Sequence, residues 1–427
     1  MSTVSLEERL AQMGRDLRQE LSDGKELSGG FFCRMGKLFV EELLGAEVGG
    51  ALGREKGQRR AADGQAGYRN GYKPRELRTG EGPIEVDVPQ VRGYAVGGEE
   101  QPYRSAIWAG LGRRSVSLEK LAVEMYARGL STRDIEELLG ELCEQEDQTL
   151  LSRSAVSQVT EALWEEYEAF SKRELSAFDV VYLFCDAVYE SLRQQAGCRQ
   201  AILVTWGICS DGAKVLLHMS LGNKESGENW LEHFRSLVSR NLPTPLTVTT
   251  DGAPGLIKAV EAMWPEAERI RCWFHKMQNV LDKVPDEMRE PIKRLLQDVR
   301  DAPDHATGQQ RAGALIEQYQ RELPSAMACL ADDLEASLAH LKLPSLHQKK
   351  IRTTNLCERS FVEQRRRSKV IPHFFDEKSC LKLVFATLWR ASQRWQGVTF
   401  SAMEKKQLEG YIRVRQALGK KVRDLAA

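Results

Sequence analysis

The hydrophobic pattern changes along the chain and predicts a helical first part followed by a strand-rich part. Leucine and methionine recur three or four residues apart over residues 6–21, which predicts an amphipathic helix. A second helix is predicted from Phe31 to Leu44, and the glycine-rich stretch Gly45–Gly53 is expected to end it. Strict alternation over Ile84–Pro89 then predicts a half-buried strand near a sheet edge.

Residues 115–170 have the spacing of helices joined by tight turns. The first covers Ser117–Arg128 and is ended by Gly129. Ser131–Asp134 resembles a capping box that starts the next helix, and Ser152 opens another, rich in small polar residues. The succession is typical of a helix-turn-helix in which the Ser152 helix reads a major groove. Plain helical packing is the alternative, because the pattern is short.

From about residue 178 the pattern becomes that of a sheet. Three apolar runs with short turns between them predict a meander of strands: Val180–Tyr189, Ala201–Cys209 and Lys214–Leu221. A helix, a strand, a helix and a strand follow: Glu228–Ser239, Leu246–Thr250, Pro254–Met263 and Arg269–Phe274. From 283 to 343 only helical spacing is found. We therefore predict an α/β fold with a mixed-sheet core of the RNase H-like type and an all-helical insertion, preceded by mostly helical domains.

The composition is that of a globular protein, but its charge is segregated. Of 427 residues, 42% are hydrophobic and 29% charged, with a formal net charge of zero. Basic residues are concentrated in Arg54–Arg78, expected to be a loop, and in Lys349–Lys369, while acids gather elsewhere, as in Asp134–Asp147. A phosphate backbone responds to local patches and not to the total charge, so both basic segments are candidates for binding DNA. A solvated surface is the alternative.

Other features of the sequence exclude several classes of protein. No apolar run approaches the roughly 20 residues needed to cross a bilayer, and no signal peptide is recognisable. The nine cysteines are scattered without a CxxC pair, which argues against a disulfide framework or a structural zinc site. We expect a cytoplasmic, nucleoid-associated protein with no membrane partner.

Three acids are the candidates for chemistry. Asp186 lies within the apolar run 180–189, where an ionised carboxylate needs a cation, a proton or strong donors. Asp251 directly follows the strand predicted at 246–250. Glu358 follows Asn355, a natural N-cap, so a capping box is its alternative role, as a simple turn is for Asp251 and backbone or arginine partners are for Asp186. Together the three could supply oxygen ligands to two Mg²⁺ ions in a phosphoryl-transfer site.

Seven short segments, met in order, carry a family resemblance. They are Arg69–Tyr72, Val86–Pro89, Ala127–Ile135, Asp186–Tyr189, Thr250–Leu256, Arg271–Asn279 and Arg352–Arg359. They resemble the transposases of Mutator-type bacterial insertion sequences, in the DDE superfamily, over most of the chain. The resemblance implies an RNase H-like catalytic domain with a helical insertion before the last acid, and Asp186, Asp251 and Glu358 as its acidic triad. Gln90 stands where the family often has Arg, a departure away from the proposed chemistry.

The resemblance also implies an activity and its partners. We expect a Mg²⁺-dependent transposase, with Mn²⁺ able to substitute, that binds the terminal inverted repeats of its element in double-stranded DNA. It would cut at the ends to expose a 3′-hydroxyl and join that hydroxyl to target DNA, as a homodimer or larger assembly. The alternatives are a structure-specific nuclease or resolvase, which would lack strand joining, and a non-catalytic DNA-binding regulator, which would tolerate loss of all three acids.

Further residues are assigned roles around these acids. Those expected to contact DNA are Arg352, Arg359, Arg365, Arg366, Arg367 and Lys369 near Glu358, and Arg69, Lys73, Ser152, Arg153 and Ser154 in the N-terminal part. Cys272 and His275 match the family's Cys-x-x-His signature. Because two ligands make no structural zinc site, Cys272 is expected in the core and His275 as a supporting or DNA-contacting residue at the sheet's edge.

The predicted organisation has six parts. The first two are DNA-binding: residues 1–95, helical with a basic loop, and 96–175, helix-turn-helix-like and also suited to dimerisation. The core is then divided into 176–282 and 346–395 by the helical insertion 283–345, and a helical tail covers 396–427.

Overall fold

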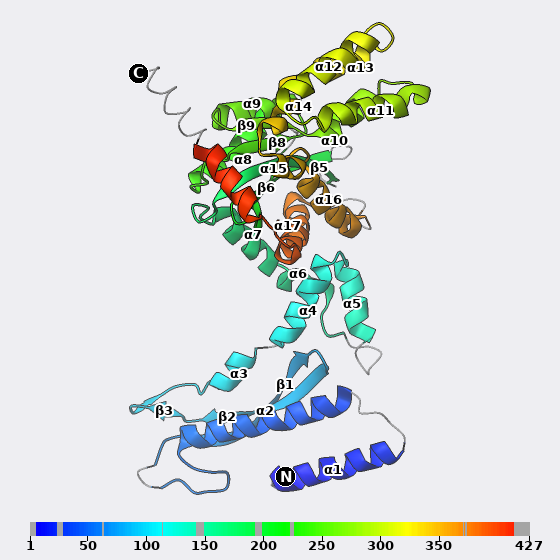
Figure 1. The fold of residues 1–427 in the computed structure, drawn as a ribbon. Helices are drawn as coiled ribbons and strands as arrows, with labels where there is room; N and C mark the ends of the chain where they lie inside the picture. The colour runs from blue at the N-terminus through cyan, green and yellow to red at the C-terminus, as the bar shows by residue number, and fades with distance from the viewer. Residues whose placement is uncertain are drawn as a thin grey trace. The chain divides into compact units, whose positions relative to one another are not determined.

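The computed structural model describes residues 6–23, 29–61, 64–112, 114–141, 149–192, 199–222, 226–369, 371 and 374–413. Contacts divide the chain into two compact units, Met1–Ala162 and Leu163–Ala427 (Figure 1). The finer boundaries within each unit stay predictions. No helix in the described part of the chain has the length and apolar character needed to span a membrane.

The first unit begins with two helices and a β-hairpin. The elements are α1 (Leu6–Ser22), α2 (Gly29–Leu52), β1 (Tyr68–Thr79) and β2 (Gly82–Arg92). β1 and β2 pair antiparallel, and Val40 and Leu44 of α2 share a core with Ile84 and Val86 of β2. This confirms the first helix and the alternating strand. The basic segment 54–78 is only partly a loop, since its second half forms β1.

The predicted end of the second helix is wrong. α2 continues through Gly45, Gly49 and Gly50 and stops at Leu52, just before Gly53, whose φ is +61°. Leu44, Val48 and Leu52 follow one another at one-turn spacing, and all three are almost completely buried. Burial of this apolar stripe outweighs the roughly 1 kcal/mol that each glycine costs in a helix.

Three helices after the hairpin confirm the predicted helical segment. A short ribbon of β3 (Ala95–Val96) and β4 (Glu99–Glu100) and helix α3 (Ala106–Leu111) lead to α4 (Val116–Ala127), α5 (Thr132–Glu141) and α6 (Arg153–Val159). The backbone N–H of Asp134 donates to Ser131 Oγ (3.1 Å), and that of Ser131 donates to Asp134 Oδ2 (2.9 Å). This is the predicted reciprocal cap. Leu118, Ile135 and Val156 join α4, α5 and α6 in one core. The acids Glu144, Glu146 and Asp147 lie outside the described residues.

The second unit contains the predicted mixed sheet. Its strands are β5 (Val180–Ser191), β6 (Arg199–Cys209), β7 (Lys214–Gly222), β8 (Thr247–Thr250) and β9 (Glu268–Arg271). Their order is β7-β6-β5-β8-β9. β5, β6 and β7 are antiparallel, as a meander requires, whereas β8 and β9 run parallel to β5.

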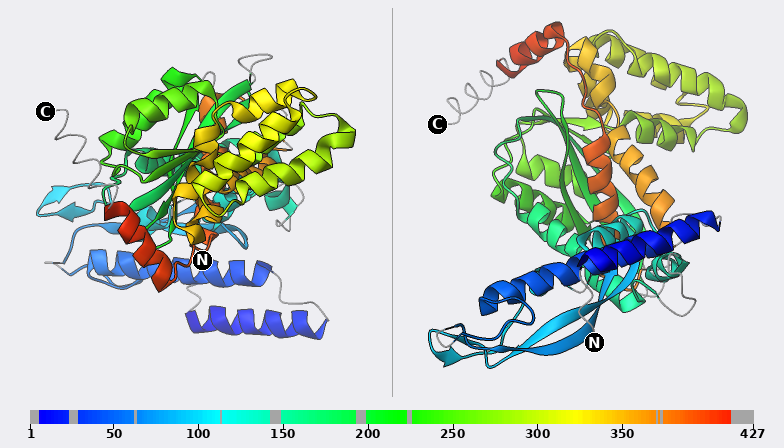
Figure 2. Two further views of the ribbon diagram at one scale, coloured as in Figure 1. Left: turned by 45° about the horizontal axis from the view of Figure 1, so that its top comes forward. Right: turned by 90° about the horizontal axis from the view of Figure 1, so that it is seen from below.

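Helices cover both faces of this sheet (Figures 1 and 2). On one face, Leu183 and Cys185 of β5 share a core with α8 (Gly227–Ser239) and α9 (Pro254–Met263). The other face carries α16 (Asn355–Ser368) and α17 (Glu377–Arg394), and α7 (Ala162–Lys172) packs on α17 through its aromatic rings. Because strand side chains alternate, Asp186 belongs to the α16 face of β5.

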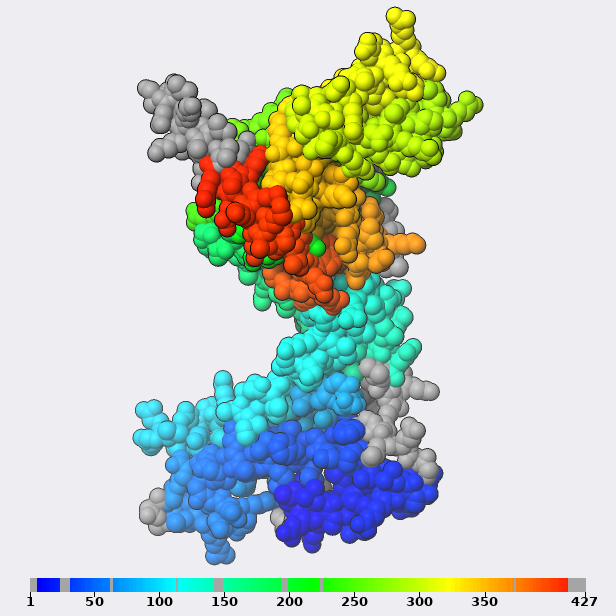
Figure 3. All heavy atoms as spheres, in the orientation of Figure 1, coloured from blue at the N-terminus to red at the C-terminus, as the bar shows by residue number. Residues whose placement is uncertain are grey.

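The insertion is all-helical over the described residues 283–345, as predicted. It follows α10 (Trp273–Leu281) with α11 (Asp286–Arg300), α12 (His305–Tyr319), α13 (Pro324–Ala331), α14 (Leu334–Leu338) and the 3₁₀ turn η1 (Ala339–Lys342), and α15 (Ser345–Ile351) leads back to the core. In Figure 3, α11–α13 form a lobe, coloured yellow and yellow-green. The strand predicted at 269–274 ends earlier, at Arg271, because Cys272 is the N-cap of α10.

Candidate active site and nucleic-acid interface

Asp186 and Asp251 lie at the same end of two neighbouring parallel strands. Cys185 of β5 is in register with Thr250 of β8, so the next residue on each strand is an acid. Asp186 is 6% exposed, and its Oδ1 accepts the backbone N–H of Ala187 at 2.8 Å. Burial and the neighbouring Asp251 carboxylate raise the pKa of Asp186 well above its ordinary value, while the nearby His275 opposes that rise.

The turn that carries Asp251 packs closely against the side chain of Arg271, at the end of β9. Gly252 has φ +88°, and a Cβ built there would lie 0.7 Å from Nη1 of Arg271. Arg271 is 8% exposed, and its guanidinium occupies the space beside the glycine. Only glycine suits this close approach and this backbone angle. The Asp-Gly pair therefore forms a tight turn that also positions the Asp251 carboxylate. Asp251 Oδ1 accepts the backbone N–H of Ala253 at 3.0 Å.

Glu358 is held by the contacts of α16 with the sheet. The Cys357 thiol donates to the carbonyl oxygen of Phe184 on β5 (3.6 Å), which attaches α16 to the strand that bears Asp186. Just before α16, the backbone N–H of Trp273 donates to the carbonyl oxygen of Arg352 at 2.9 Å. The start of α16 is thereby fixed to the junction of β9 and α10.

The predicted capping box at Asn355 is wrong. The N-cap of α16 is Thr354, Asn355 is the first helical residue, and no side chain caps the helix. The Thr354 hydroxyl lies 3.3 Å from Oε1 of Glu358 and can donate to it. The Glu358 carboxylate is thus turned toward the Thr354 side chain and does not close a cap on its own helix.

Glu358 lies close to the Cys-x-x-His pair, Cys272 and His275. The ligand atoms of Cys272, His275 and Glu358 all lie within 4.8 Å of one another. Cys272 is fully buried, as predicted, and the Thr354 N–H donates to its Sγ at 3.3 Å. His275 lies in the first turn of α10, which begins directly after the edge strand β9. The order of elements in the sequence gave no sign of this convergence, since Glu358 comes 83 residues after His275.

The predicted DNA-contacting residues in and beside α16 differ in whether they already form contacts with other residues of the chain. Arg352 forms an ion pair with Asp301 of the insertion and is 16% exposed. Other members of the set have these partners: Arg366 and Arg367 pair with Glu363, and the Arg359 guanidinium lies over the Trp395 ring at 5.6 Å. Arg365 and Lys369 are exposed. Surface ion pairs such as those of Glu363 are weak and exchange readily.

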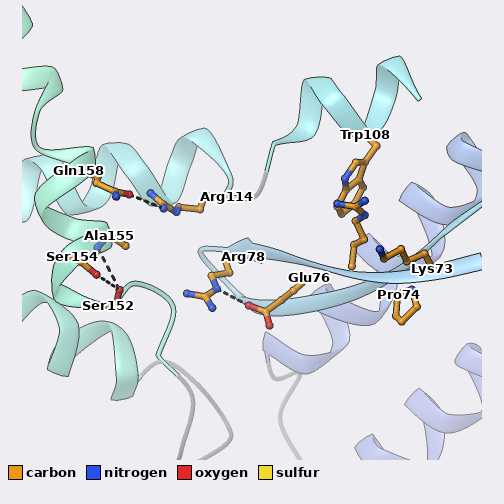
Figure 4. Close-up of a pocket in the computed structure, with 11 residues that line it drawn as sticks. Lys73, Pro74, Glu76, Arg78, Trp108, Arg114, Ser152, Ser154, Ala155 and Gln158 are labelled. Carbon is orange, nitrogen blue, oxygen red and sulfur yellow. Dashed lines mark hydrogen bonds and ion pairs between the residues drawn. The ribbon is translucent and has the colours of Figure 1, made fainter. Parts of the chain in front are cut away.

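A basic pocket lies within the first unit (Figure 4). The cavity, about 510 Å³ in volume, is lined by Lys73, Pro74, Arg75, Glu76, Arg78, Trp108, Arg114, Ser152, Ser154, Ala155 and Gln158. Four of these side chains are cationic and one is acidic, so the pocket suits an anion. In Figure 4 the β1 residues lie on one side, and Ser152, Ser154 and Gln158 of the α6 region on the other.

This pocket unites some of the predicted residues and leaves others out. Lys73, Ser152 and Ser154 line it, whereas Arg153 pairs with Glu136 (2.8 Å) and Arg69 donates to the carbonyl oxygen of Arg54 (3.3 Å). The lining residues Trp108, Arg114 and Gln158 were missed. No motif marks them, because they come from three separate elements that only the fold brings together.

The fold and the site define an α/β protein with a buried acidic centre on a mixed sheet, preceded by a unit with a basic pocket. The family model described as "Transposase, Mutator family" matches residues 9–398. The chain therefore belongs to the Mutator family of transposases, as the resemblance of its motifs implied.

Curated relatives are transposases of insertion sequences. The transposase for insertion sequence element ISRM5 of Rhizobium meliloti is 31% identical, and the match covers 83% of this chain and 86% of that protein. The transposase for IS406 of Burkholderia multivorans is 30% identical over 84% of this chain and 90% of its own length. The transposase for IS1081 of Mycobacterium tuberculosis is 30% identical over 84% and 83%.

Proposed function

We propose that this chain is a divalent-metal-dependent DNA transposase with an RNase H-like core. It binds the terminal inverted repeats of its own insertion sequence, cuts DNA at the ends of the element and joins the freed 3′-hydroxyl to a target strand. The observation that supports the proposal is the register of β5 and β8, which puts Asp186 and Asp251 directly after a pair of neighbouring residues, together with the contact of Cys357, next to Glu358, with β5. Family membership supports the same class of reaction.

The acids fit divalent cations. Burial and repulsion by Asp251 raise the pKa of Asp186, and a bound cation compensates for both effects as a proton does. Asp186, Asp251 and Glu358 would hold Mg²⁺, or Mn²⁺ in its place, through the oxygen donors these ions prefer. When bound, the ions stabilise the charge that develops on the attacking and leaving oxygens of a phosphodiester.

The protein's own part is to hold these groups and the DNA in position. The Arg271 side chain packs against the Asp251 turn, and the Thr354 hydroxyl can donate a hydrogen bond to Glu358. The exposed Arg365 and Lys369 on α16 would bind the phosphates of the strand that is cut. Preorganisation of this kind lowers the barrier because little has to move as charge develops.

Recognition of the element's ends is assigned to the first unit. The cations of the pocket, Lys73, Arg75, Arg78 and Arg114, would contact phosphates, and the Ser152 helix would lie against the same duplex. A synapse of two ends calls for a homodimer or larger assembly, which we include in the proposal.

The decisive experiment separates binding from cleavage. Asp251→Asn should reduce cleavage of DNA that carries the terminal repeats by about 100- to 1,000-fold, on the order expected for loss of a group that acts in the transition state. The same variant should bind the repeats within about threefold of the unchanged chain. Asp211→Asn is the matched control, because Asp211 is an exposed acid in a tight turn of the same sheet, and it should cut normally.

Two further outcomes would overturn the proposal. An Asp251→Asn chain that still cuts would remove Asp251 from the site. An unchanged chain that cuts its ends but never joins them to a second DNA would be a nuclease and not a transposase.

The assignment of the pocket has its own test. Arg114→Ala should reduce the slope of log affinity against log salt concentration by about 1, since one phosphate contact is lost. Lys120→Ala, an exposed cation on α4 that does not line the pocket, should leave the slope unchanged. Equal slopes for both variants would place the DNA elsewhere.

A further inference from the structure

A second candidate metal site lies beside the acids, and its donors are of a different kind. Cys272 at the β9–α10 junction, His275 in α10 and Glu358 in α16 place a sulfur, a nitrogen and an oxygen within 4.8 Å of one another. Among the described residues this is the one group of three His, Cys, Asp or Glu side chains that meets this condition. The three come from two segments far apart in the sequence, so helical periodicity does not explain their meeting.

His275 has a polar atom without a partner. Its Nδ1 is buried, and no residue in the described part of the chain forms a hydrogen bond with it. A buried ring nitrogen left unpaired costs about 1–3 kcal/mol, and such atoms are uncommon in folded proteins. A ligand at this nitrogen accounts for the arrangement.

The surroundings of Cys272 suit a thiolate. The backbone N–H of Thr354 donates to Sγ at 3.3 Å, the Thr354 hydroxyl lies at 3.5 Å, and the backbone N–H of His275 also donates to it. These donors would stabilise the thiolate form that a sulfur ligand takes when it binds a metal ion.

The set of donors decides which ions fit. Thiolate and imidazole ligands select Zn²⁺ and similar transition metals, whereas Mg²⁺ takes oxygen ligands. Three protein ligands that leave one position open are the arrangement of a non-structural zinc site. The sequence argument that two ligands make no zinc site holds for the Cys-x-x-His pair alone, and the fold supplies the third ligand.

We propose that Cys272, His275 and Glu358 form a transition-metal site of Zn²⁺ type, which shares the Glu358 carboxylate with the oxygen-only site proposed for Mg²⁺ and differs from it in its sulfur and nitrogen donors. The site goes beyond the proposed function. Metal binding by these three residues needs neither DNA nor the two aspartates, so its failure and the failure of transposition are distinguishable.

The test uses Co²⁺ as a coloured substitute for Zn²⁺ on the full chain freed of metal by a chelator. One equivalent of Co²⁺ should produce a thiolate-to-metal charge-transfer band, which Zn²⁺ abolishes and excess Mg²⁺ does not. Cys272→Ser should lose the band. Cys357→Ser should keep it, because Cys357 is also buried and borders Glu358 but directs its thiol to the Phe184 carbonyl. Circular dichroism checks that each variant is folded.

If a cysteine variant fails to fold, the Zn²⁺ affinity of variants at the other two proposed ligands tests the site. His275→Gln and Glu358→Gln change partly exposed residues and should each weaken Zn²⁺ binding by more than the roughly 10–100-fold that loss of an outer-shell partner costs. The absence of a charge-transfer band in the unchanged chain would overturn the proposal. So would a band that persists in Cys272→Ser, or Zn²⁺ affinity that is unaffected in His275→Gln.

Discussion

Asp186→Asn should make the metal-free protein more stable while it destroys the proposed chemistry. Burial and the charge of Asp251 raise the pKa of Asp186 from 3.8 to about 8 in the folded chain. Asparagine has nearly the same shape, and its Oδ1 can still accept the Ala187 N–H that the aspartate accepts at 2.8 Å. The substitution therefore removes the charge and little else.

The sign and the size of the effect follow from the pKa. A carboxyl group whose folded pKa is raised stabilises the fold fully below its unfolded value, and this stability is lost as the pH rises to the folded value. The pH window is thus from about 4 to about 8. At about 1.4 kcal/mol for each pH unit, the loss is at most about 6 kcal/mol. Because the surroundings of a buried charge relax and admit water, we expect the actual loss of stability on ionisation of Asp186 to be about 2–3 kcal/mol.

The assay is urea unfolding with a chelator present, at pH 5 and at pH 8.5. The difference in free energy of unfolding between Asp186→Asn and the unchanged chain should favour the variant, and it should grow between the two pH values. Asp211→Asn is the control, since Asp211 also accepts a backbone N–H at 2.8 Å but is exposed. It should change stability by less than about 0.5 kcal/mol at either pH. A variant no more stable than the unchanged chain at pH 8.5 would refute the electrostatic reasoning.

Three further predictions concern buried positions in the two units. Gly252→Ala should lower the free energy of unfolding in urea by about 2–3 kcal/mol, because the φ at this position is +88° and the added Cβ would overlap the Arg271 guanidinium. Gly313→Ala in α12 is the control: the added Cβ would meet open space, so the variant should be as stable as the unchanged chain or more stable. Val48→Ala should cost about 2 kcal/mol by the same measurement, because the glycine-containing end of α2 depends on its burial. Cys357 should resist iodoacetamide in the native chain and react in urea, as mass spectrometry of its peptide would show, because burial raises the pKa of its thiol.

The elements that could be predicted were those with a strong local signal. Val180–Tyr189 has no Pro or Gly and is rich in β-branched and aromatic residues, and it forms the central strand β5. Ser131 and Asp134 formed the expected cap because both partners lie within one turn. The acid on β5 was also visible, since a lone carboxylate in an apolar run is rare enough to attract notice.

The predictions that failed were decided by contacts distant in the sequence. Local propensity ends α2 at Gly45, but burial of Val48 and Leu52 extends it. Asn355 is a good N-cap by composition, yet Thr354 takes that place, with its hydroxyl close to Glu358. The lining of the basic pocket combines a hairpin with helices, a combination that periodicity within a single segment cannot report.

The helical insertion is tied to both segments that carry the site, so it sets their spacing. Trp273, at the start of α10, donates its indole N–H to the Ser337 carbonyl of α14 (2.6 Å), and Arg352, just before α16, pairs with Asp301 after α11. The backbone bond from Trp273 to Arg352 then joins the two segments directly. These contacts hold the segment of His275 and the segment of Glu358 at a fixed spacing, so a shift of the insertion would carry both segments with it. The helical insertion therefore supports the candidate site, although it separates Asp251 from Glu358 in the sequence.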